Sequence, residues 1–574
     1  MIQKILHINK VLALSIFVLL SSSFAFSQGD AISENTAPEF ISPVDHTLRL
    51  AGSFGELRSN HFHAGIDIKS KKGEEGDTIR ASASGYISRI KIQRGGYGQV
   101  LYMDHPNGYT SVYAHLKDFD ETLKQYIKDK QYENRSYEID VYPEPRKFQF
   151  QQGEPIALMG NTGRSYGPHL HFEIRNTKTE VPENPYLHGL GPEDTRAPLL
   201  YAVEVHGLDN EHRKIWSKSQ SVNSGSNNSV QPYTFIVPAW RAGFALQTFD
   251  QMNGANNKNG IYSIEMFVDD SLYYSHIMDR VGFDVSHYIN SHIDYETKKK
   301  NNRSFTKCYV APGNKLTFYP GLVNNGEVKL FKEKARKVDF VIKDFKGNTN
   351  TYSCFVKRRD AKEGELKTKT FQKYLKYGEV ANVTLGSCRF VFPENALDKN
   401  TFITYDESII NNLPSFQINT SADPLFSYPG VSIPISGIDS HYLDKVILVN
   451  EGKTSYGGHV ENDSLRVRFG KFGKYAVHID TIPPTIEVGS FLKNAKGKPF
   501  FRFAIYDNYD TRGYARDVKY DVFIDGEWII SSLKALGNVL IVPLDNIHSG
   551  EHALKIRVED HSKNVRTWER KFIN

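Results

Sequence analysis

Short segments with the length and pattern of β-strands make up most of this chain. Apolar and polar residues alternate over 201–205 and 485–488, and the apolar runs 389–393 and 445–449 are also of strand length. Alternation with a period of two gives a strand one apolar and one polar face. Asp, Gly and Asn turns recur between these segments, and aromatic residues make up 12% of the chain. The pattern predicts a mainly β protein with sandwich domains.

One segment has helical periodicity instead. Phe119, Leu123 and Ile127 recur every fourth residue, and Asp118 precedes them as a potential N-cap. The spacing predicts a helix over about 118–132, at the start of an insertion that runs to Arg146. We expect the insertion either to border a functional groove or to pack against the outer edge of a sheet.

A degenerate internal repeat follows further along the chain. Residues 194–198 (DTRAP) resemble 480–484 (DTIPP), and the strand-like stretches after them also correspond. The correspondence continues through three further pairs: 244–250 with 503–507, 267–270 with 523–526, and Asp344/Asn348 with Asp560/Asn564. Each copy predicts an immunoglobulin-like β-sandwich, and the first copy carries an insertion between Asp269 and Asp344.

The repeated aspartates allow two interpretations. Carboxylates bind hard cations such as Ca²⁺. Aspartate is also common in β-turns because it hydrogen-bonds the local backbone. From the sequence alone the turn interpretation is favoured.

The N-terminus predicts export. Lys4 and Lys10 precede or flank an apolar run over 11–20, and Ala25 and Ser27 place small residues at −3 and −1 of a cut before Gln28. An uncleaved membrane tether is the alternative. No second long apolar stretch occurs, so we expect no membrane span after cleavage. The protein is predicted to be periplasmic, attached to the cell envelope or extracellular.

These boundaries divide the chain into five predicted parts. They are a signal peptide (1–27), a catalytic domain (28–190), an immunoglobulin-like sandwich with an insertion (191–361), a β-rich sandwich-like domain (362–478) and a second immunoglobulin-like sandwich (479–574).

Composition narrows the function only slightly. The chain is 39% hydrophobic and 24% charged, which is ordinary for a globular protein, and a net charge of +5 gives no reason to expect nucleic-acid binding. Its three cysteines are widely spaced, so neither a disulfide framework nor a cysteine zinc motif is predicted.

The candidate chemistry lies in three short motifs. They are residues 63–67 (HAGID), 113–116 (YAHL) and 167–173 (GPHLHFE). In an extended strand His169 and His171 lie on the same face, with Leu170 turned to the core. His63 and Asp67 are four residues apart and would also lie on one face. Gly65 between them has no side chain that could obstruct a metal. The motifs supply two imidazoles and a carboxylate for a metal, and two imidazoles for proton transfer.

With these motifs the chain resembles the lysostaphin/LytM-type zinc endopeptidases over about residues 48–186. Further similar segments are 85–87, 97–100, 103–105, 153–156 and 160–163. The resemblance implies an antiparallel-sheet peptidase domain that binds one Zn²⁺ through His63, Asp67 and His171. It implies that His115 and His169 stay unliganded beside a metal-activated water, as catalytic residues whose individual roles the sequence does not assign.

The resemblance also implies a substrate, namely stem or cross-link peptides of peptidoglycan. A direct cross-link is favoured over a glycyl bond, because no wall-targeting module is recognisable. Two alternatives belong to other classes: a non-catalytic LytM-like regulator of a cell-wall amidase, and an adhesion or assembly protein. In each case the sandwich domains could bind proteins of the cell envelope.

Four neighbouring residues have open roles. Arg58 stands near the position at which some family members carry a tyrosine, so it is either a transition-state contact or a solvated loop charge. His61 is expected in the wall of the groove, and His105 is expected to be a structural turn histidine. Glu173 is either a support for the metal ligands or part of a salt bridge at the strand edge.

Overall fold

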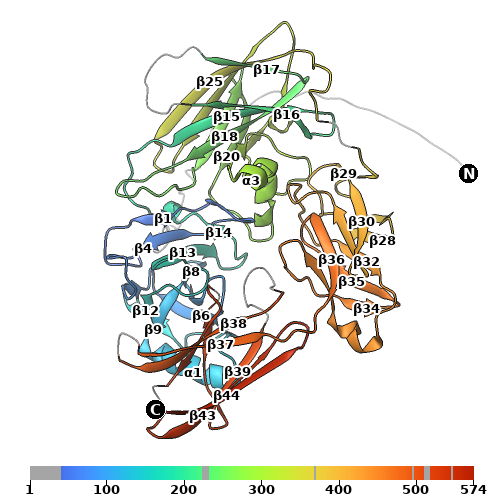
Figure 1. Cartoon of the computed structure of the whole chain (residues 1–574). Helices are drawn as coiled ribbons and strands as arrows, with labels where there is room; N and C mark the ends of the chain where they lie inside the picture. The colour runs from blue at the N-terminus through green and yellow to red at the C-terminus, as the bar shows by residue number, and fades with distance from the viewer. Residues whose placement is uncertain are drawn as a thin grey trace, which may run out of the picture. The chain divides into compact units, whose positions relative to one another are not determined.

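The computed structural model describes most of the chain after residue 39 (Figure 1). The described residues are 40–222, 232–367, 370–493, 497–509, 518–534, 536–544 and 547–574. The predicted signal peptide lies outside them. No helix among them combines the length and the apolar character that crossing a bilayer requires. Antiparallel sheets dominate, as the alternation predicts.

The N-terminal region, predicted to be the catalytic domain, contains a nine-stranded sheet. Its order is β1-β4-β13-β8-β7-β6-β10, with β11 paired to β6 and β14 paired to β13. The strands are β1 (Leu50–Gly52), β4 (Ile66–Lys69), β6 (Gly85–Ile92), β7 (Gln99–Asp104), β8 (Tyr109–Ala114), β10 (Ile139–Val141), β11 (Gln149–Phe150), β13 (His169–Asn176) and β14 (Pro182–Glu183).

A second, three-stranded sheet completes this core. Its order is β5 (Thr78–Arg80), β12 (Pro155–Met159) and β9 (Leu116–Phe119). A two-stranded hairpin, β2 (Leu57–Arg58) and β3 (His61–Phe62), precedes the first metal-binding motif, and a 3₁₀ helix, η1 (Pro185–His188), follows the last strand.

The predicted helix is present but begins later than expected. Helix α1 spans Glu121–Glu133, and its N-cap is Asp120, whose carboxylate accepts a hydrogen bond from the backbone N–H of Thr122. Asp118 was the wrong cap, because it lies in β9 and pairs with Leu158 of β12. Leu123 and Ile127 are buried in the core of the domain, so α1 packs on that core.

The next domain has two sheets around one core. The first is ordered β16-β15-β18-β21, with β23 on β18, and the second β17-β25-β24-β19-β20-β22; β17 and β25 run parallel. The strands are β15 (Leu199–Leu208), β16 (Lys214–Ser221), β17 (Tyr233–Val237), β18 (Arg241–Phe249), β19 (Ser263–Val268), β20 (Ser271–Ile277), β21 (Thr306–Lys307), β22 (Gly321–Leu322), β23 (Val328–Lys329), β24 (Arg336–Lys343) and β25 (Thr349–Arg358).

The insertion in this domain lies between β20 and β24. Besides β21, β22 and β23, it holds four short helices: η2 (Ser286–Tyr288), α2 (Ile289–His292), α3 (Tyr295–Asn301) and η3 (Asn324–Gly326).

The third region again packs two sheets around one core. They are ordered β27-β28-β32-β35-β34 and β30-β31-β36-β33, and β26 pairs separately with β29. The two apolar runs predicted as strands are β28 and β33. The elements are β26 (Lys373–Leu375), β27 (Ala381–Leu385), β28 (Cys388–Phe392), β29 (Thr401–Ile403), β30 (Tyr405–Ile410), β31 (Leu413–Ile418), β32 (Gly430–Pro434), η4 (Ser440–Lys445), β33 (Val446–Asn450), β34 (His459–Glu461), β35 (Ser464–Arg468) and β36 (Gly473–Ile479).

The C-terminal region has two four-stranded sheets, β37-β38-β42-β41 and β40-β39-β43-β44. Its strands are β37 (Thr485–Lys493), β38 (Pro499–Tyr506), β39 (Lys519–Ile524), β40 (Glu527–Trp528), β41 (Ser532–Lys534), β42 (Val539–Pro543), β43 (Glu551–Glu559) and β44 (Val565–Ile573).

The topology reproduces the repeat that the sequence indicates. In the first copy β15 pairs with β18, β19 with β20 and β24, and β24 with β25. In the second copy β37 pairs with β38, β39 with β40 and β43, and β43 with β44. Asp344 and Asp560 occupy the same turn of the two copies, between β24 and β25 and between β43 and β44.

Candidate metal centre

The central strand β13 brings the three motifs together. His171 lies opposite Asp67 of β4 on one side and opposite Ala114 of β8 on the other. His115 follows Ala114 directly. Leu170 and Phe172 on the opposite face are fully buried. The alternation in GPHLHFE therefore places His171 beside Asp67 and turns Leu170 and Phe172 to the core.

Three ligand atoms converge at this point. Asp67 Oδ1 lies 3.0 Å from both His63 Nε2 and His171 Nδ1, and these two nitrogens are 2.9 Å apart. Tetrahedral zinc ligands at about 2.0–2.1 Å from the ion stand about 3.3 Å from one another. The three side chains are 5–7% exposed. His63, Asp67 and His171 thus form a set of the size that Zn²⁺ requires.

Hydrogen bonds on the side of each ring that faces away from the triad set the tautomers of His63 and His171. His63 Nδ1–H donates to the carbonyl of Ser53 at 2.7 Å, and His171 Nε2–H donates to Glu173 Oε1 at 2.7 Å. Carbonyl and carboxylate oxygens can only accept, so in the neutral rings the inner nitrogens carry lone pairs. In the deprotonated state that binds a metal, two nitrogen lone pairs and a carboxylate oxygen face one another, which is the donor set that a divalent cation fits.

Charges in the site shift the pKa values of its acids and bases. Burial raises the pKa of Asp67, but the neighbouring His63 and His171 outweigh it and hold that pKa well below its ordinary value. Burial lowers the pKa of His171, but hydrogen bonds to Asp67 and Glu173 raise it to about 9. The carboxylates of Asp67 and Glu173 therefore place negative charge on both sides of this imidazole, which favours a cation at the site.

Glu173 supports the metal ligands. It is fully buried, accepts the hydrogen bond from His171, and also contacts the hydroxyl of Tyr97 and Arg175 Nε, the latter at 2.6 Å. Burial raises its pKa, but Arg175 and then His171 lower it to about 2. Glu173 therefore orients His171 and forms a salt bridge with Arg175, but this salt bridge is buried in the internal strand β13 and does not lie at a strand edge as predicted.

Arg58 is not a solvated loop charge. Its Nη2 lies 2.8 Å from Asp67 Oδ2, the oxygen that faces away from the two histidines. A Cβ at Gly52 would come within 2.3 Å of Arg58 Nη2, so the glycine makes room for this ion pair. Arg58 thus orients Asp67 and leaves Oδ1 directed to the metal position.

His115 and His169 lie beside the triad. Their ring centroids are 4.7 Å apart, and that of His115 is 5.9 Å from His171. His115 Nδ1–H donates to the carbonyl of Thr162 at 2.8 Å and His169 Nδ1–H to that of Gly167 at 2.8 Å, which leaves each Nε2 as an acceptor. His115 has φ of 60°, a left-handed conformation rare for a non-glycine residue.

Both rings are held neutral. Burial, and then the charges of His169 and His171, lower the pKa of His115 to about 3. Burial also lowers the pKa of His169. At neutral pH each is therefore a proton acceptor.

The remaining candidate histidines are outside the cluster. His61 is exposed and its ring contacts only the backbone of Ser59 at 3.0 Å. His105 is buried and bonds Ser84 O and Ser111 Oγ, at 3.0 and 2.7 Å, as a structural turn histidine. Sequence reasoning missed Ser53 and Thr162, which act through backbone carbonyls and so leave no side-chain signature.

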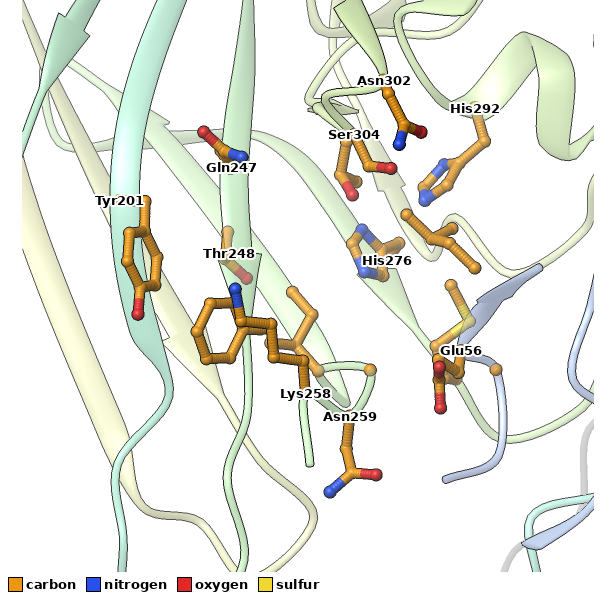
Figure 2. Close-up of a pocket in the computed structure, with 17 residues that line it drawn as sticks. Glu56, Tyr201, Gln247, Thr248, Lys258, Asn259, His276, His292, Asn302 and Ser304 are labelled. Atoms are coloured by element: carbon orange, nitrogen blue, oxygen red, sulfur yellow. The ribbon is translucent and has the colours of Figure 1, made fainter. Parts of the chain in front are cut away.

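The pocket shown in Figure 2 is separate from this site. It measures about 280 Å³ and lies between Glu56 of the catalytic region and residues of the next domain, among them Tyr201, Lys258 and His276. None of the five predicted site residues lines it.

Two family models match the chain. Residues 61–132 and 146–185 match Peptidase family M23, and residues 372–480 match a Zu5-like domain. The first match contains all five predicted site residues, and its gap falls in the insertion that the sequence indicates. The N-terminal region is therefore a Peptidase family M23 domain of LytM type.

Curated relatives match part of this chain. The DD-carboxypeptidase/endopeptidase Mpg of Neisseria meningitidis serogroup B is 34% identical over 140 residues, 24% of this chain and 26% of that protein. The murein hydrolase activator NlpD of Escherichia coli is 31% identical over 123 residues, 21% of this chain and 25% of that protein. The match thus spans about a quarter of the length of each.

Among solved structures, the catalytic domain of lysostaphin from Staphylococcus simulans is 20% identical. The alignment covers 24% of this chain and 90% of that chain, with a TM-score of 0.19.

Proposed function

We propose that the M23 domain is a zinc-dependent endopeptidase that hydrolyses stem or cross-link peptides of peptidoglycan. The observation that carries the proposal is the convergence of His63, Asp67 and His171 on one point, with two neutral imidazoles beside it. His63, Asp67 and His171 would hold the ion. When bound there, Zn²⁺ would lower the pKa of a coordinated water to about 7 and polarise the scissile carbonyl.

The chain's own residues would handle the protons. His115 and His169 are neutral, and each has an Nε2 lone pair available. One of them takes a proton from the attacking water, and the resulting imidazolium protonates the leaving amine or stabilises the oxyanion. Arg58 and Glu173 position Asp67 and His171 and are not expected to touch the substrate.

Substrate and location rest on similarity. The relative Mpg is named a DD-carboxypeptidase/endopeptidase and NlpD a murein hydrolase activator. A peptidoglycan substrate and a place in the cell envelope follow for this chain as proposals, together with the predicted export signal. We further propose the direct cross-link as the bond, since no wall-targeting module is recognisable.

The test is mass spectrometry of purified peptidoglycan fragments incubated with the zinc-loaded full chain. We expect new peptide ends with the wild type and one zinc per chain by elemental analysis. His171→Ala should lose both the zinc and the products. His169→Ala should keep the zinc and lose about 10²–10⁴-fold in rate. The control is His441→Ala, because this exposed imidazole belongs to the third region and is not one of the predicted site or groove residues, so it should change neither readout.

A non-catalytic regulator of an amidase is the second candidate, favoured by the similarity to NlpD. The complete set of five site residues argues against it. Stoichiometric zinc without any new peptide ends, under conditions in which a partner amidase is stimulated, would establish the regulator and refute the peptidase.

A further inference from the structure

Three aspartates converge in the first repeat, next to the segment through which the chain enters this domain. Carboxylate oxygens of Asp194, Asp250 and Asp344 all lie within 4.8 Å of one another. Asp194 precedes β15, Asp250 follows β18, and Asp344 follows β24. Since β15 and β18 belong to one sheet and β24 to the other, the cluster links the two layers of the domain.

The cluster lacks a counter-charge of its own. Within the described part of the chain, none of the three carboxylates forms an ion pair within 4.0 Å. Asp344 accepts hydrogen bonds from the backbone and side chain of Asn348, whereas Asp250, only 1% exposed, has a buried Oδ1 with no partner. An unpaired buried carboxylate oxygen beside two further carboxylates is costly unless a cation or a proton joins them.

The pKa values of Asp250 and Asp344 are raised, as expected for carboxylates without a counter-charge. Burial, and then the charges of Asp194 and Asp344, raise the pKa of Asp250 to about 7, against a backbone hydrogen bond from Gln251 and the charge of Arg196, which lower it. Burial also raises the pKa of Asp344. A shared proton could relieve the repulsion, and so could a metal ion.

Another acidic cluster in the same domain differs because it contains a positively charged side chain. Glu204 and Asp294 meet at His206, but Lys214 Nζ lies 2.6 Å from Asp294. That cluster carries its own cation and needs no other.

The arrangement recurs in the second repeat. Oxygens of Asp480, Asp507 and Asp560 lie within 4.8 Å of one another. Asp507 is only partly buried, and its Oδ1 has no hydrogen-bond partner among the described residues. Asn564 Nδ2 donates to Asp560 Oδ2 at 2.9 Å and to the backbone carbonyl of Asp480 at 3.0 Å.

The first repeat has the same two hydrogen bonds. Asn348 Nδ2 donates to Asp344 Oδ2 at 2.7 Å and to the carbonyl of Asp194 at 3.2 Å. Turn hydrogen bonding explains Asp344 and Asp560. It does not explain Asp250 and Asp507, which lie outside this turn, just after the corresponding strands β18 and β38.

We propose that each triad binds one Ca²⁺ ion. The donors are all oxygens, which suits a hard cation and not the nitrogen and sulfur preference of zinc. Ca²⁺–oxygen distances of about 2.3–2.6 Å allow ligands up to about 5 Å apart across the ion, and the carboxylate oxygens of each triad are close enough to one another to share such an ion. Backbone carbonyls and water would complete the coordination.

Each triad lies at a junction between two domains. Asp194 lies in the linker that follows η1, and Asp480 follows directly on β36 of the preceding domain. Burial, and then the charges of Asp250, Asp194 and Asp344, raise the pKa of Tyr186 in η1 well above its ordinary value, so the end of the catalytic region adjoins the first triad. Ca²⁺ there fixes the linker to the sandwich that follows it.

The experiment is equilibrium dialysis of the full zinc-loaded chain with ⁴⁵Ca²⁺ after treatment with EGTA. We expect two Ca²⁺ per chain for the wild type, one for Asp250→Asn, one for Asp507→Asn, and none for the double variant. Asp270→Asn, an exposed aspartate of the first repeat, is the matched control and should retain two. Each Asn substitution is nearly isosteric and removes repulsion, so these variants are expected to fold.

Limited proteolysis supplies an independent readout. Ca²⁺ should slow cleavage between residues 189 and 198 at least several-fold in the wild type, and should have no effect on Asp250→Asn. Absence of Ca²⁺ uptake at 5 mM free ion by the wild type would overturn the proposal, leaving a shared proton as the occupant. Retention of both ions by the double variant would overturn it equally. Complete displacement by equimolar Mg²⁺ would refute the assignment to Ca²⁺.

Discussion

At the residue scale, the orientation of His63 and of His171 depends on the hydrogen bond made by the ring nitrogen that points away from the proposed metal position. The sequence predicts which five residues meet, because HxGxD, YAH and HxH are local patterns with fixed parity. It offers the support of His171 by Glu173 as one of two alternatives, but it does not predict that the Ser53 carbonyl sets the tautomer of His63. A backbone carbonyl has no residue signature, so such partners can be found only from the fold.

Glu173 offers the sharpest residue-scale prediction. Glu173→Gln removes the negative charge behind His171, makes that ligand less electron-rich, and leaves the buried Arg175 without its carboxylate partner. We expect zinc affinity to fall about 10–100-fold, measured by competition with a chromophoric chelator.

The control for this prediction is an exposed glutamate of the same domain. Glu144 is exposed, and Glu144→Gln should leave zinc affinity unchanged. An unaltered affinity in Glu173→Gln would show that Glu173 is only a structural partner of Arg175.

At the element scale, periodicity predicted the types of the elements better than their ends. The parity of His169, Leu170 and His171 in β13 is as expected. The start of α1 differs by about three residues, because pairing with β12 keeps Asp118 in a strand and moves the cap to Asp120. Long-range pairing of this kind outweighs a local capping signal.

The role of Gly65 also differs from the prediction. The expected reason for a glycine was free space beside the metal. The structure shows instead that a Cβ at this position would lie 2.2 Å from the carbonyl oxygen of Phe172. The glycine permits the close approach of the backbone just before β4 to β13, which a single sequence does not reveal.

Gly65→Ala should therefore separate β4 from β13. We expect a loss of about 1–3 kcal/mol in the free energy of unfolding, typical of overpacking, and weaker zinc binding, because Asp67 and His171 lie on the two separated strands. Urea unfolding and zinc titration measure these effects. Gly167→Ala is the control, since a Cβ there meets nothing within 4 Å, and its stability should stay within about 0.5 kcal/mol.

At the scale of the whole molecule, the repeat was visible in the sequence but the support of the metal centre by the next domain was not. Phe54 and Phe62 flank the β2–β3 hairpin and share a hydrophobic cluster with Met278 and Phe318, more than two hundred residues later. The backbone N–H of Phe62 also donates to Ser286 Oγ at 2.9 Å. Apolar residues carry no indication of which distant partner covers them.

This cluster predicts that a substitution in the second domain weakens zinc binding. The ring of Phe318 meets that of Phe62 edge to face, with centroids 5.4 Å apart. Phe62 directly precedes His63, so Phe318→Leu should loosen the hairpin that carries a metal ligand. We expect a severalfold loss of zinc affinity in the full chain, measured by chelator competition.

Phe244→Leu separates this coupling from general destabilisation. Phe244 is fully buried in the core of the same domain and contacts Phe235 and Phe340, not the hairpin. Both Phe→Leu changes should lower the midpoint of thermal unfolding by removing packed aromatic volume, but only Phe318→Leu should change zinc affinity. Equal zinc affinities in the two variants would mean that the hairpin holds His63 in place without the second domain.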